Sequence, residues 1–210
     1  EIPELNIRVN SNMCERKELL HRLIDKGFIV HENPLIENGI IVEDGAILGI
    51  PEYKCGMFSV QSTSSLRSVE LLNPQPGDKI LDICAAPGGK TSAMAEIMRD
   101  CGEILACDIH EHRVELINEI ASRLGLSCIK ATTMDATYYD EELYEQFDKV
   151  LADVPCSGLG VIASKPELKL RVNLNDFPNL YEIQYSILRN AFMYLKPGGE
   201  LVYSTCTINK

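Results

Sequence analysis

Two cysteines stand in polar, turn-forming surroundings where a thiol could act as a nucleophile. Cys156 belongs to the sequence DVPCSG and Cys206 to YSTCT, and each follows a short apolar run typical of a buried strand. A thiolate at such a place is suited to covalent catalysis. Its formation needs a helix terminus or a nearby cation, and Lys90 is a candidate for that cation. We therefore expect two thiols from adjacent strands to face one substrate.

The remaining cysteines carry no such signal. A free cysteine usually behaves as a small buried hydrophobe, and no pair here has the C-x-x-C spacing of a zinc site or the pattern of a disulfide framework. We predict no metal site, and reduced thiols fit a cytosolic protein. The hydrophobe interpretation applies to the thiols of Cys14, Cys55, Cys84, Cys101, Cys107 and Cys128.

A loop of small residues lies within residues 79–91, KILDICAAPGGKT, between a predicted strand and a predicted helix. Low side-chain bulk would let a ligand approach the backbone and the first N–H groups of the helix. Gly and Pro also suit any strand-to-helix turn, so a plain turn and a cofactor cradle remain equally open at this point. A triphosphate-binding loop is disfavoured, because position 85 is alanine where G-x-x-x-x-G-K-[ST] requires glycine. The residues of the candidate cradle are Cys84, Ala85, Ala86, Pro87, Gly88, Gly89 and Lys90.

Three aspartates follow predicted strands. Asp108 ends the strand after the loop, and Asp135 and Asp153 end the next two. Ligands of parallel sheets bind outside the carboxyl ends of the strands, where an acid such as Asp108 can accept hydrogen bonds from ribose hydroxyls. Each aspartate alone is more often a helix cap or a turn residue. Three of them on one rim, beside a glycine loop, favour a nucleoside cofactor.

Alternating strand and helix patterns from residue 58 onward position these residues. Predicted strands at 80–83, 104–107, 128–132, 150–152 and 201–204 alternate with helical stripes, which predicts an α/β fold with a parallel sheet and right-handed crossovers. We expect the inward faces of the helices to carry Met94, Ile97 and Met98, then Leu116, Ile117, Ile120, Ala121 and Leu124, then Ile183, Ile187, Leu188, Ala191 and Leu195.

The N-terminal part, residues 1–57, has a different pattern from residues 58–210. Short strands are predicted at 6–9, 28–30, 40–42 and 46–50, with one helix at 15–26, which indicates a small α+β module. Composition alone leaves a structural extension and an RNA-contacting module equally open. The helix carries basic residues that could contact RNA or form a solvated face, namely Arg16, Lys17, Arg22 and Lys26.

The composition limits the classes of function. In 210 residues no run approaches the roughly 18 apolar residues of a membrane span, and the first residues have no signal-peptide pattern. We expect a soluble, cytoplasmic monomer. A net charge of −11 argues against a generally basic surface that coats nucleic acid. Any contact with RNA must therefore be local or assisted by another domain.

Three motifs, LDICAAPGGKT, LADVPCSGLG and LVYSTCT, together resemble those of the RNA cytosine-C5 methyltransferases, the Sun (Fmu)/NOL1/NOP2 family. NIRVN near the start, GMFSVQ at 56–61 and the helix with Ile183 and Gln184 resemble the bacterial branch that modifies 16S, small-subunit ribosomal RNA. The chain departs from the family at two places. Ser62 and Thr63 stand where Asp-Glu often follows Gln61 in the family. Ala163-Ser164 precede Lys165-Pro166 where the family often has two arginines, so two cations are missing at this second place.

The resemblance implies a Rossmann-like methyltransferase domain that binds S-adenosylmethionine with the loop from Cys84 to Lys90 and with Asp108, Asp135 and Asp153. It also implies covalent catalysis, because C5 of cytosine is too weak a nucleophile until a thiolate adds to C6. Cys206 would be the nucleophile, Cys156 would assist release, Asp153 would lie between cofactor and base, and Lys90 would supply local positive charge. The cytosine must be unpaired to enter such a pocket.

The motifs do not name the RNA. A tRNA-directed enzyme is the main alternative to ribosomal RNA, and an inactive RNA-binding assembly factor is another, although both cysteines and the whole glycine loop are present. A DNA cytosine methyltransferase ranks third, because it uses the P-C cysteine as nucleophile and lacks the T-C motif. The chain ends soon after Cys206, before the last strands that such a fold adds, and lacks the N-terminal helical domain of the bacterial enzymes. We therefore expect a fragment.

Overall fold

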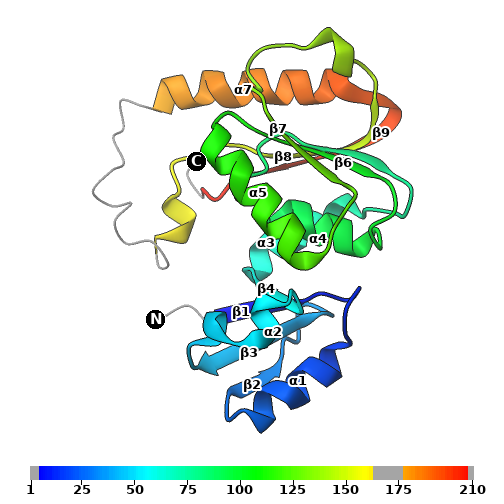
Figure 1. Cartoon of the computed structure of the whole chain (residues 1–210). Coiled ribbons are helices and arrows are strands. Elements are labelled where there is room, and N and C mark those ends of the chain that lie inside the picture. Colours follow the sequence, from blue (N-terminus) through cyan, green and yellow to red (C-terminus); the bar gives the residue numbers. More distant parts are fainter. Residues whose placement is uncertain (1–4, 163–176, 208–210) are drawn as a thin grey trace.

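The N-terminal module is a small antiparallel sheet with one long helix. The computed structural model describes residues 5–162 and 177–207 (Figure 1). The sheet order is β2-β3-β1-β4. Leu19 and Leu23 of the helix pack against Ile7 and Ile40 of the sheet, as the apolar stripe predicts. The elements are β1 (Leu5–Val9), α1 (Arg16–Asp25), β2 (Ile29–Glu32), β3 (Gly39–Asp44), η1 (Ile47–Gly49), α2 (Pro51–Lys54) and β4 (Phe58–Val60).

Two features of this module differ from the sequence prediction. Residues 46–50 were expected to form a strand, but they contain the 3-10 turn η1, and α2 then begins at Pro51. Proline favours the first position of a helix, because its fixed φ suits the helix and its missing N–H is not needed there. In addition, β4 pairs with β1, so the first sheet extends to Val60, past the predicted boundary at residue 57.

The second part is the parallel sheet that the alternating pattern predicts. Its strand order is β7-β6-β5-β8-β9, and all four pairings are parallel. The α/β fold class is therefore confirmed. The elements are α3 (Thr63–Leu72), β5 (Lys79–Asp82), α4 (Gly89–Ile97), β6 (Glu103–Asp108), α5 (Glu111–Leu124), β7 (Ile129–Thr133), η2 (Glu141–Leu143), β8 (Phe147–Asp153), η3 (Leu159–Val161), α7 (Phe177–Tyr194) and β9 (Leu195–Ser204).

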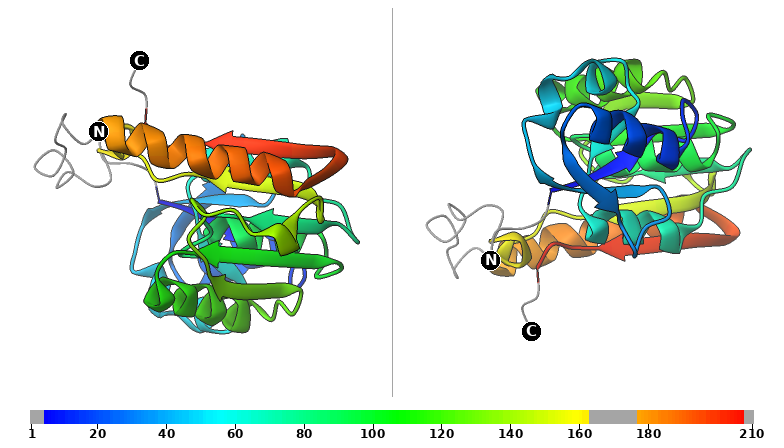
Figure 2. Two further views of the ribbon diagram at one scale, coloured as in Figure 1. Left: turned by 90° about the horizontal axis from the view of Figure 1, so that it is seen from above. Right: turned by 90° about the horizontal axis from the view of Figure 1, so that it is seen from below.

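Helices cover both faces of this sheet (Figure 1). Leu66 of α3, Met94 of α4 and Leu124 of α5 pack on one face with Ile80 and Ile104. On the other face, α7 packs through its buried apolar residues against β8 and β9. The N-terminal module lies beyond α3, α4 and α5, on the side of the sheet opposite α7 (Figures 1 and 2).

Two of the residues predicted to face inward on helices are exposed, and a third lies in a strand. Ile97 is 43% exposed at the last position of α4, where it borders a cavity next to the N-terminal module. Leu116 is 40% exposed, because the buried stripe of α5 runs through Val114, Ile117 and Ala121. Leu195 begins β9 instead of ending the helix.

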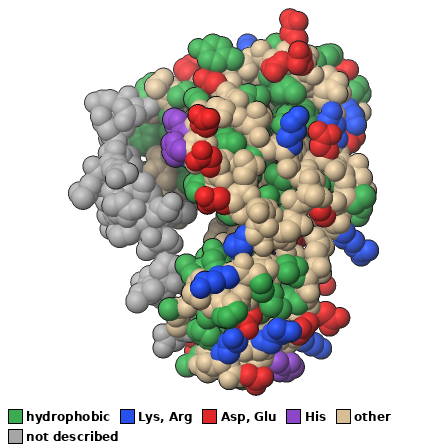
Figure 3. Space-filling model, viewed as in Figure 1, with side chains coloured by type: hydrophobic (Ala, Val, Ile, Leu, Met, Phe, Trp, Pro, Cys, Tyr) green, Lys and Arg blue, Asp and Glu red, His purple; other side chains and the backbone are tan. Residues whose placement is uncertain are grey.

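The surface matches the acidic composition. In the view of Figure 3, Lys and Arg side chains are interspersed with Asp and Glu over both parts of the chain and do not gather into one basic patch. None of the helices in the described residues is long and apolar enough to cross a membrane. The departure at Ala163-Ser164 lies outside the described residues.

Candidate active site

A cavity of about 230 Å³ opens at the carboxyl ends of β5, β6 and β8. This is the edge where parallel sheets bind ligands. Five residues singled out in the sequence line it: Cys84, Ala86, Asp108, Asp135 and Asp153. The sequence did not single out Arg113 or Thr137, and it assigned Ile183 and Ile187 to the helix core alone. The further lining residues are Ile83, Ile109, Met134, Ala136 and Pro155.

The small-residue loop contributes only Cys84 and Ala86 to the cavity wall, and its other residues pack behind that wall. Gly88 has φ of +104°, a conformation that L side chains rarely adopt, and a Cβ atom there would lie 3.2 Å from the Cα atom of Ile117. Ala85 is buried against Ala106 and Ile117. The packing at Gly88 and Ala85 requires small residues, because both lie against Ile117 of α5. Five residues of the loop are absent from the cavity lining, namely Ala85, Pro87, Gly88, Gly89 and Lys90.

Asp108 is a buried carboxylate at the end of β6. It is 4% exposed, and its Oδ1 accepts a hydrogen bond of 3.1 Å from the backbone N–H of His110. Arg113 Nη1 lies 3.1 Å from Asp108 Oδ2, while Arg113 Nη2 donates to the carbonyl of Ala86 at 2.9 Å. A carboxylate has about four acceptor positions, so Asp108 retains capacity for ligand hydroxyls. The position of Arg113, in the first turn of the helix after Asp108, was the only sequence signal for it.

Asp135 makes the turn contacts expected of an aspartate in a loop. Its Oδ1 accepts hydrogen bonds from the backbone N–H of Thr137 at 3.0 Å and from the Thr137 hydroxyl at 2.7 Å. This is an Asx turn, the structural role that the sequence left open. Because Asp135 also lines the cavity, it has both a turn role and access to a ligand.

Lys90 and Asp153 form an ion pair between the start of α4 and the end of β8. Lys90 Nζ lies 2.5 Å from Asp153 Oδ2, and the Ser204 hydroxyl donates to Asp153 Oδ1 at 2.6 Å. Asp153 therefore joins the loop to the end of β9. Lys90, which the sequence suggested as the cation that favours a thiolate, is therefore paired with the carboxylate of Asp153.

The thiols of Cys156 and Cys206 meet beyond the ends of β8 and β9. Their sulfur atoms are 2.7 Å apart, and the backbone N–H of Cys206 donates to Cys156 Sγ at 3.2 Å. Both cysteines are free thiols. The two sulfurs are in direct contact, and either one could donate a proton to the other.

The surroundings make the two thiols unequal. Burial opposes ionisation of Cys156, but hydrogen bonds from the Cys206 thiol, from Thr207 and from backbone N–H groups outweigh it and lower the pKa of Cys156. Burial, the hydrogen bond with Cys156 and the charges of Cys156 and Asp153 raise the pKa of Cys206 to about 11. These contacts favour Cys156 over Cys206 as the more acidic thiol of the pair.

A second cavity, of about 230 Å³, adjoins Cys156. The amide of Gln184 donates to the carbonyl of Pro155 at 2.7 Å, so α7 is fixed against the segment that carries Cys156. Pro155 lines the first cavity, and its neighbour Cys156 lines the second, so the two cavities are adjacent. The second cavity is lined by Cys156, Ser157, Phe177, Leu180, Tyr181, Gln184, Thr205 and Thr207.

No group of three or more His, Cys, Asp and Glu side chains that could hold a metal ion occurs within residues 5–162 and 177–207. The two cavities instead offer backbone groups, aspartates, thiols and one aromatic wall. Such an arrangement can hold a nucleoside ligand beside a planar base.

Comparisons with known proteins point to one family. The family model of the 16S rRNA methyltransferase RsmB/F matches residues 69–210. The chain is 43% identical over 209 residues to the probable ribosomal RNA small subunit methyltransferase B of Bacillus subtilis (strain 168), which covers 99% of this chain and 47% of that protein. It is 36% identical over 222 residues to the human 28S rRNA (cytosine(4447)-C(5))-methyltransferase, with 99% of this chain and 26% of that protein covered.

A solved structure agrees with the sequence matches. The crystal structure of a methyltransferase homolog protein from Pyrococcus horikoshii superimposes with a TM-score of 0.86 at 34% identity, covering 98% of this chain and 65% of that one. The chain thus spans about half the length of the Bacillus relative. The match with this structure extends over both the N-terminal module and the parallel sheet.

Proposed function

The chain belongs to the 16S rRNA methyltransferase RsmB/F family, and we propose that it forms the catalytic part of an S-adenosylmethionine-dependent RNA cytosine-C5 methyltransferase. The observation that carries this proposal is the contact between two free thiols, 2.7 Å apart, beside a cavity with aspartates on its rim. A thiol pair of unequal acidity is what addition to C6 of cytosine and later release require.

The first cavity fits the cofactor. The loop before α4 contributes Cys84 and Ala86 to the cavity wall, and Asp108 offers a buried carboxylate with acceptor capacity for the ribose hydroxyls. Ile83 and Ile109 supply apolar walls, as a purine ring requires. Bound there, the cofactor supplies an electrophilic methyl group.

The thiols divide the covalent chemistry between them. The Cys156 thiolate accepts the proton of Cys206 across their hydrogen bond, and the Cys206 sulfur then bonds to C6 of the cytosine. The electron pair of the C5–C6 double bond moves to C5, which can now take the methyl group. Cys156 passes the proton it gained to water, and its thiolate then takes the proton from C5. The double bond re-forms, Cys206 is expelled as a thiolate, and it recovers its proton from Cys156.

Asp153 and Lys90 position the region between the two cavities. Asp153 lines the first cavity, and its carboxylate is fixed by Lys90 and Ser204. The ion pair holds the start of α4 at a constant distance from the end of β8. Asp153 would accordingly lie between cofactor and base, where a misplacement of about 1 Å can cost about a hundredfold in rate.

Ribosomal RNA of the small subunit is the proposed substrate. The Bacillus relative is named a small subunit methyltransferase, whereas the human relative is named for 28S rRNA, and tRNA remains the second candidate. The substrate cytosine must be unpaired, because a base that is stacked and paired in a helix cannot reach the thiols.

Parallel methylation assays test this proposal. The protein at its natural length is incubated with S-adenosylmethionine labelled in the methyl group and with 16S rRNA, 23S rRNA, tRNA or double-stranded DNA. We expect label in 16S rRNA alone, recovered as 5-methylcytidine after nuclease digestion. Label in tRNA would establish the second candidate, label in DNA would contradict the RNA assignment, and absence of transfer to every substrate would contradict the enzymatic function.

A further inference from the structure

Arg8, in the motif NIRVN, is a buried arginine that connects the two parts of the chain. It is 4% exposed, and its Nε and Nη2 atoms each lie 2.8 Å from an oxygen of Glu96, which is 3% exposed. Paired parallel bonds of this kind fix the plane of a guanidinium group. The pair joins strand β1 of the N-terminal module to helix α4 of the parallel sheet.

The same guanidinium group reaches the cofactor loop. Nη1 donates to the carbonyl oxygen of Gly89 at 2.9 Å, and Nη2 donates to the Ser92 hydroxyl at 3.0 Å. The Ser92 hydroxyl in turn donates to the Gly89 carbonyl at 3.1 Å. Arg8 Nη1 also donates to Gln61 Oε1, the last residue of GMFSVQ. Both motifs of the first 61 residues that carry the family resemblance therefore converge on the first turn of α4.

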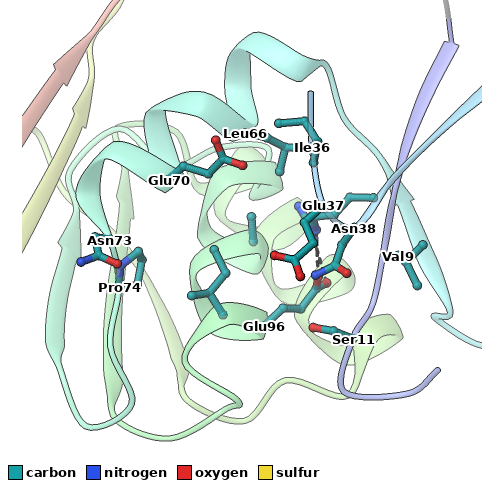
Figure 4. A pocket seen from close by; sticks show the side chains of 13 residues that line it. Val9, Ser11, Ile36, Glu37, Asn38, Leu66, Glu70, Asn73, Pro74 and Glu96 are labelled. Atoms are coloured by element: carbon teal, nitrogen blue, oxygen red, sulfur yellow. Dashed lines mark hydrogen bonds and ion pairs between the residues drawn. The ribbon is translucent and has the colours of Figure 1, made fainter. Parts of the chain in front are cut away.

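Packing alone does not hold this part of the interface. A cavity of about 280 Å³ lies between the N-terminal module and helices α3 and α4, and Arg8 and Glu96 line it (Figure 4). Figure 4 shows Glu37 and Asn38 on one side of this cavity and Leu66 and Glu70 on the other. With open space next to the ion pair, the hydrogen bonds of Arg8 to Gly89 and Ser92 are what connects β1 to the first turn of α4 at this place.

We propose that Arg8 is a positioning residue for the cofactor, which holds the loop at Gly88 and Gly89 in its binding conformation through the Gly89 carbonyl. A loop that is already ordered loses less conformational entropy when a ligand binds, so affinity rises without any direct contact. The N-terminal module thereby contributes to cofactor affinity, whatever it contacts in RNA. This inference rests on the proposed function, since it names the cofactor of that same site.

Arg123 of α5 offers a matched control. It also connects the two parts, because its Nη1 donates to the carbonyls of Tyr53 at 2.8 Å and Phe58 at 3.0 Å, and its Nη2 donates to the Ser59 hydroxyl at 2.9 Å. Its guanidinium carbon lies 4.1 Å from the centre of the Tyr53 ring. None of these partners belongs to the cofactor loop. Replacement of Arg123 therefore weakens the interface without changing the support of Gly89.

Arg8→Lys and Arg123→Lys are the variants to compare. Lysine keeps the positive charge beside Glu96, but a single ammonium group cannot hold both carboxylate oxygens and the Gly89 carbonyl. We expect Arg8→Lys to raise the Kd for S-adenosylmethionine, measured by calorimetry, by about tenfold, and Arg123→Lys to leave it unchanged. In the cofactor-free protein, hydrogen exchange of amides 88–92 should be faster in Arg8→Lys alone.

The outcomes separate this inference from the proposed function. A wild-type protein without affinity for the cofactor contradicts the proposed function, whereas equal affinity of wild type and Arg8→Lys contradicts only the role of Arg8. Equal losses in both variants indicate a general effect of the interface and also overturn it. Should Arg8→Lys fail to fold, Gln61→Leu removes an acceptor that orients Nη1, and the same increase in Kd and in exchange is expected.

Discussion

The ligand edge of the parallel sheet consists of two halves that are built differently. In the cofactor half, formed by the ends of β5 and β6 and the start of α4, the carboxylates of Asp82 and Asp108 are buried and accept hydrogen bonds from Thr91 and Arg113 respectively. In the thiol half, formed by residues 154–160 and 204–207, Cys206 is exposed and Cys156 is only partly buried. Under the proposed function this difference is expected, because a small cofactor binds a preformed pocket, whereas the base of a large RNA must enter from the surface.

The thiol half is held mainly by contacts between its own two segments. The hydroxyls of Ser157 and Thr207 are 2.7 Å apart, and the backbone N–H of Gly160 donates to the Cys206 carbonyl at 2.8 Å. A Cβ atom on Gly160 would lie 2.6 Å from that carbonyl oxygen, so only glycine allows this approach. The relative position of the two sulfurs thus depends on a few local bonds, without buried carboxylates such as Asp82 and Asp108 of the cofactor half.

The largest expected effect comes from removing the two thiols of the thiol half one at a time. Cys206→Ala should abolish both methyl transfer and any covalent protein–RNA adduct, because no sulfur can add to C6. In Cys156→Ala the exposed Cys206 can still lose its proton to water and form the adduct, but no thiolate remains to take the C5 proton. A complex resistant to denaturant should therefore accumulate on gels with labelled RNA.

Cys101→Ala is the control for these two variants. Cys101 is an exposed thiol before the start of β6, at the opposite end of the strands, so its removal should leave activity unchanged. A trapped complex in Cys206→Ala that is lost in Cys156→Ala would reverse the two roles. It would also show that the lower pKa of Cys156 marks the nucleophile itself.

The buried carboxyl group of Asp82, at the end of β5 in the cofactor half, should make the stability of the protein depend on pH. Burial raises the pKa of Asp82 from 3.8 to about 7, despite a hydrogen bond of 2.7 Å from the Thr91 hydroxyl. Between pH 4 and 7 the folded protein keeps a proton that the unfolded chain has lost, so this group makes the free energy of unfolding fall as the pH rises, and the fall ends above pH 7.

Asp82→Asn removes this titration. The free energy of unfolding of the variant minus that of the wild type should increase from pH 4 to pH 7 by on the order of 3 kcal/mol, measured by urea unfolding across that range. A difference that does not vary with pH would mean that Asp82 is ionised in the folded state and compensated by Lys90 nearby.

The sequence predicted most strands of the parallel sheet, but it predicted few of the side-chain contacts that hold the site in place. Period and turn residues locate the strands that end at Asp108 and Asp153, because these signals are local. The pairing of Arg8 with Glu96 joins residues that are 88 positions apart, so no local sequence pattern predicts it. Arg113 was missed for a different reason, because an arginine in the first turn of a helix is ordinarily a surface residue. The turn at 47–49 was misassigned because apolar residues in short runs fit strands equally well.

Within the cofactor half, Asp108 is the group whose loss should weaken the cofactor most directly. Asp108→Ala should raise the Kd for S-adenosylmethionine roughly 10- to 100-fold, which corresponds to about 1 to 3 kcal/mol for charge-assisted hydrogen bonds. Asp100→Ala is the control, because Asp100 accepts comparable bonds of 2.8 Å from the N–H groups of Ser127 and Cys128 at the other end of the sheet. Unchanged affinity in Asp108→Ala by calorimetry would contradict its assignment to the ribose.

The smallest expected effect tests how charge is shared in the thiol half. At pH 7.5 iodoacetamide should modify Cys156 faster than Cys206, because the thiolate is the reactive form and Cys206 has a pKa of about 11. In Cys156→Ala, Cys206 loses both the hydrogen bond and the charge that raise its pKa, although its burial persists. Its modification rate, measured by peptide mass spectrometry against Cys101 as internal reference, should rise about tenfold. Faster modification of Cys206 than of Cys156 in the wild type would place the thiolate on Cys206 and remove the need for proton transfer between the two sulfurs.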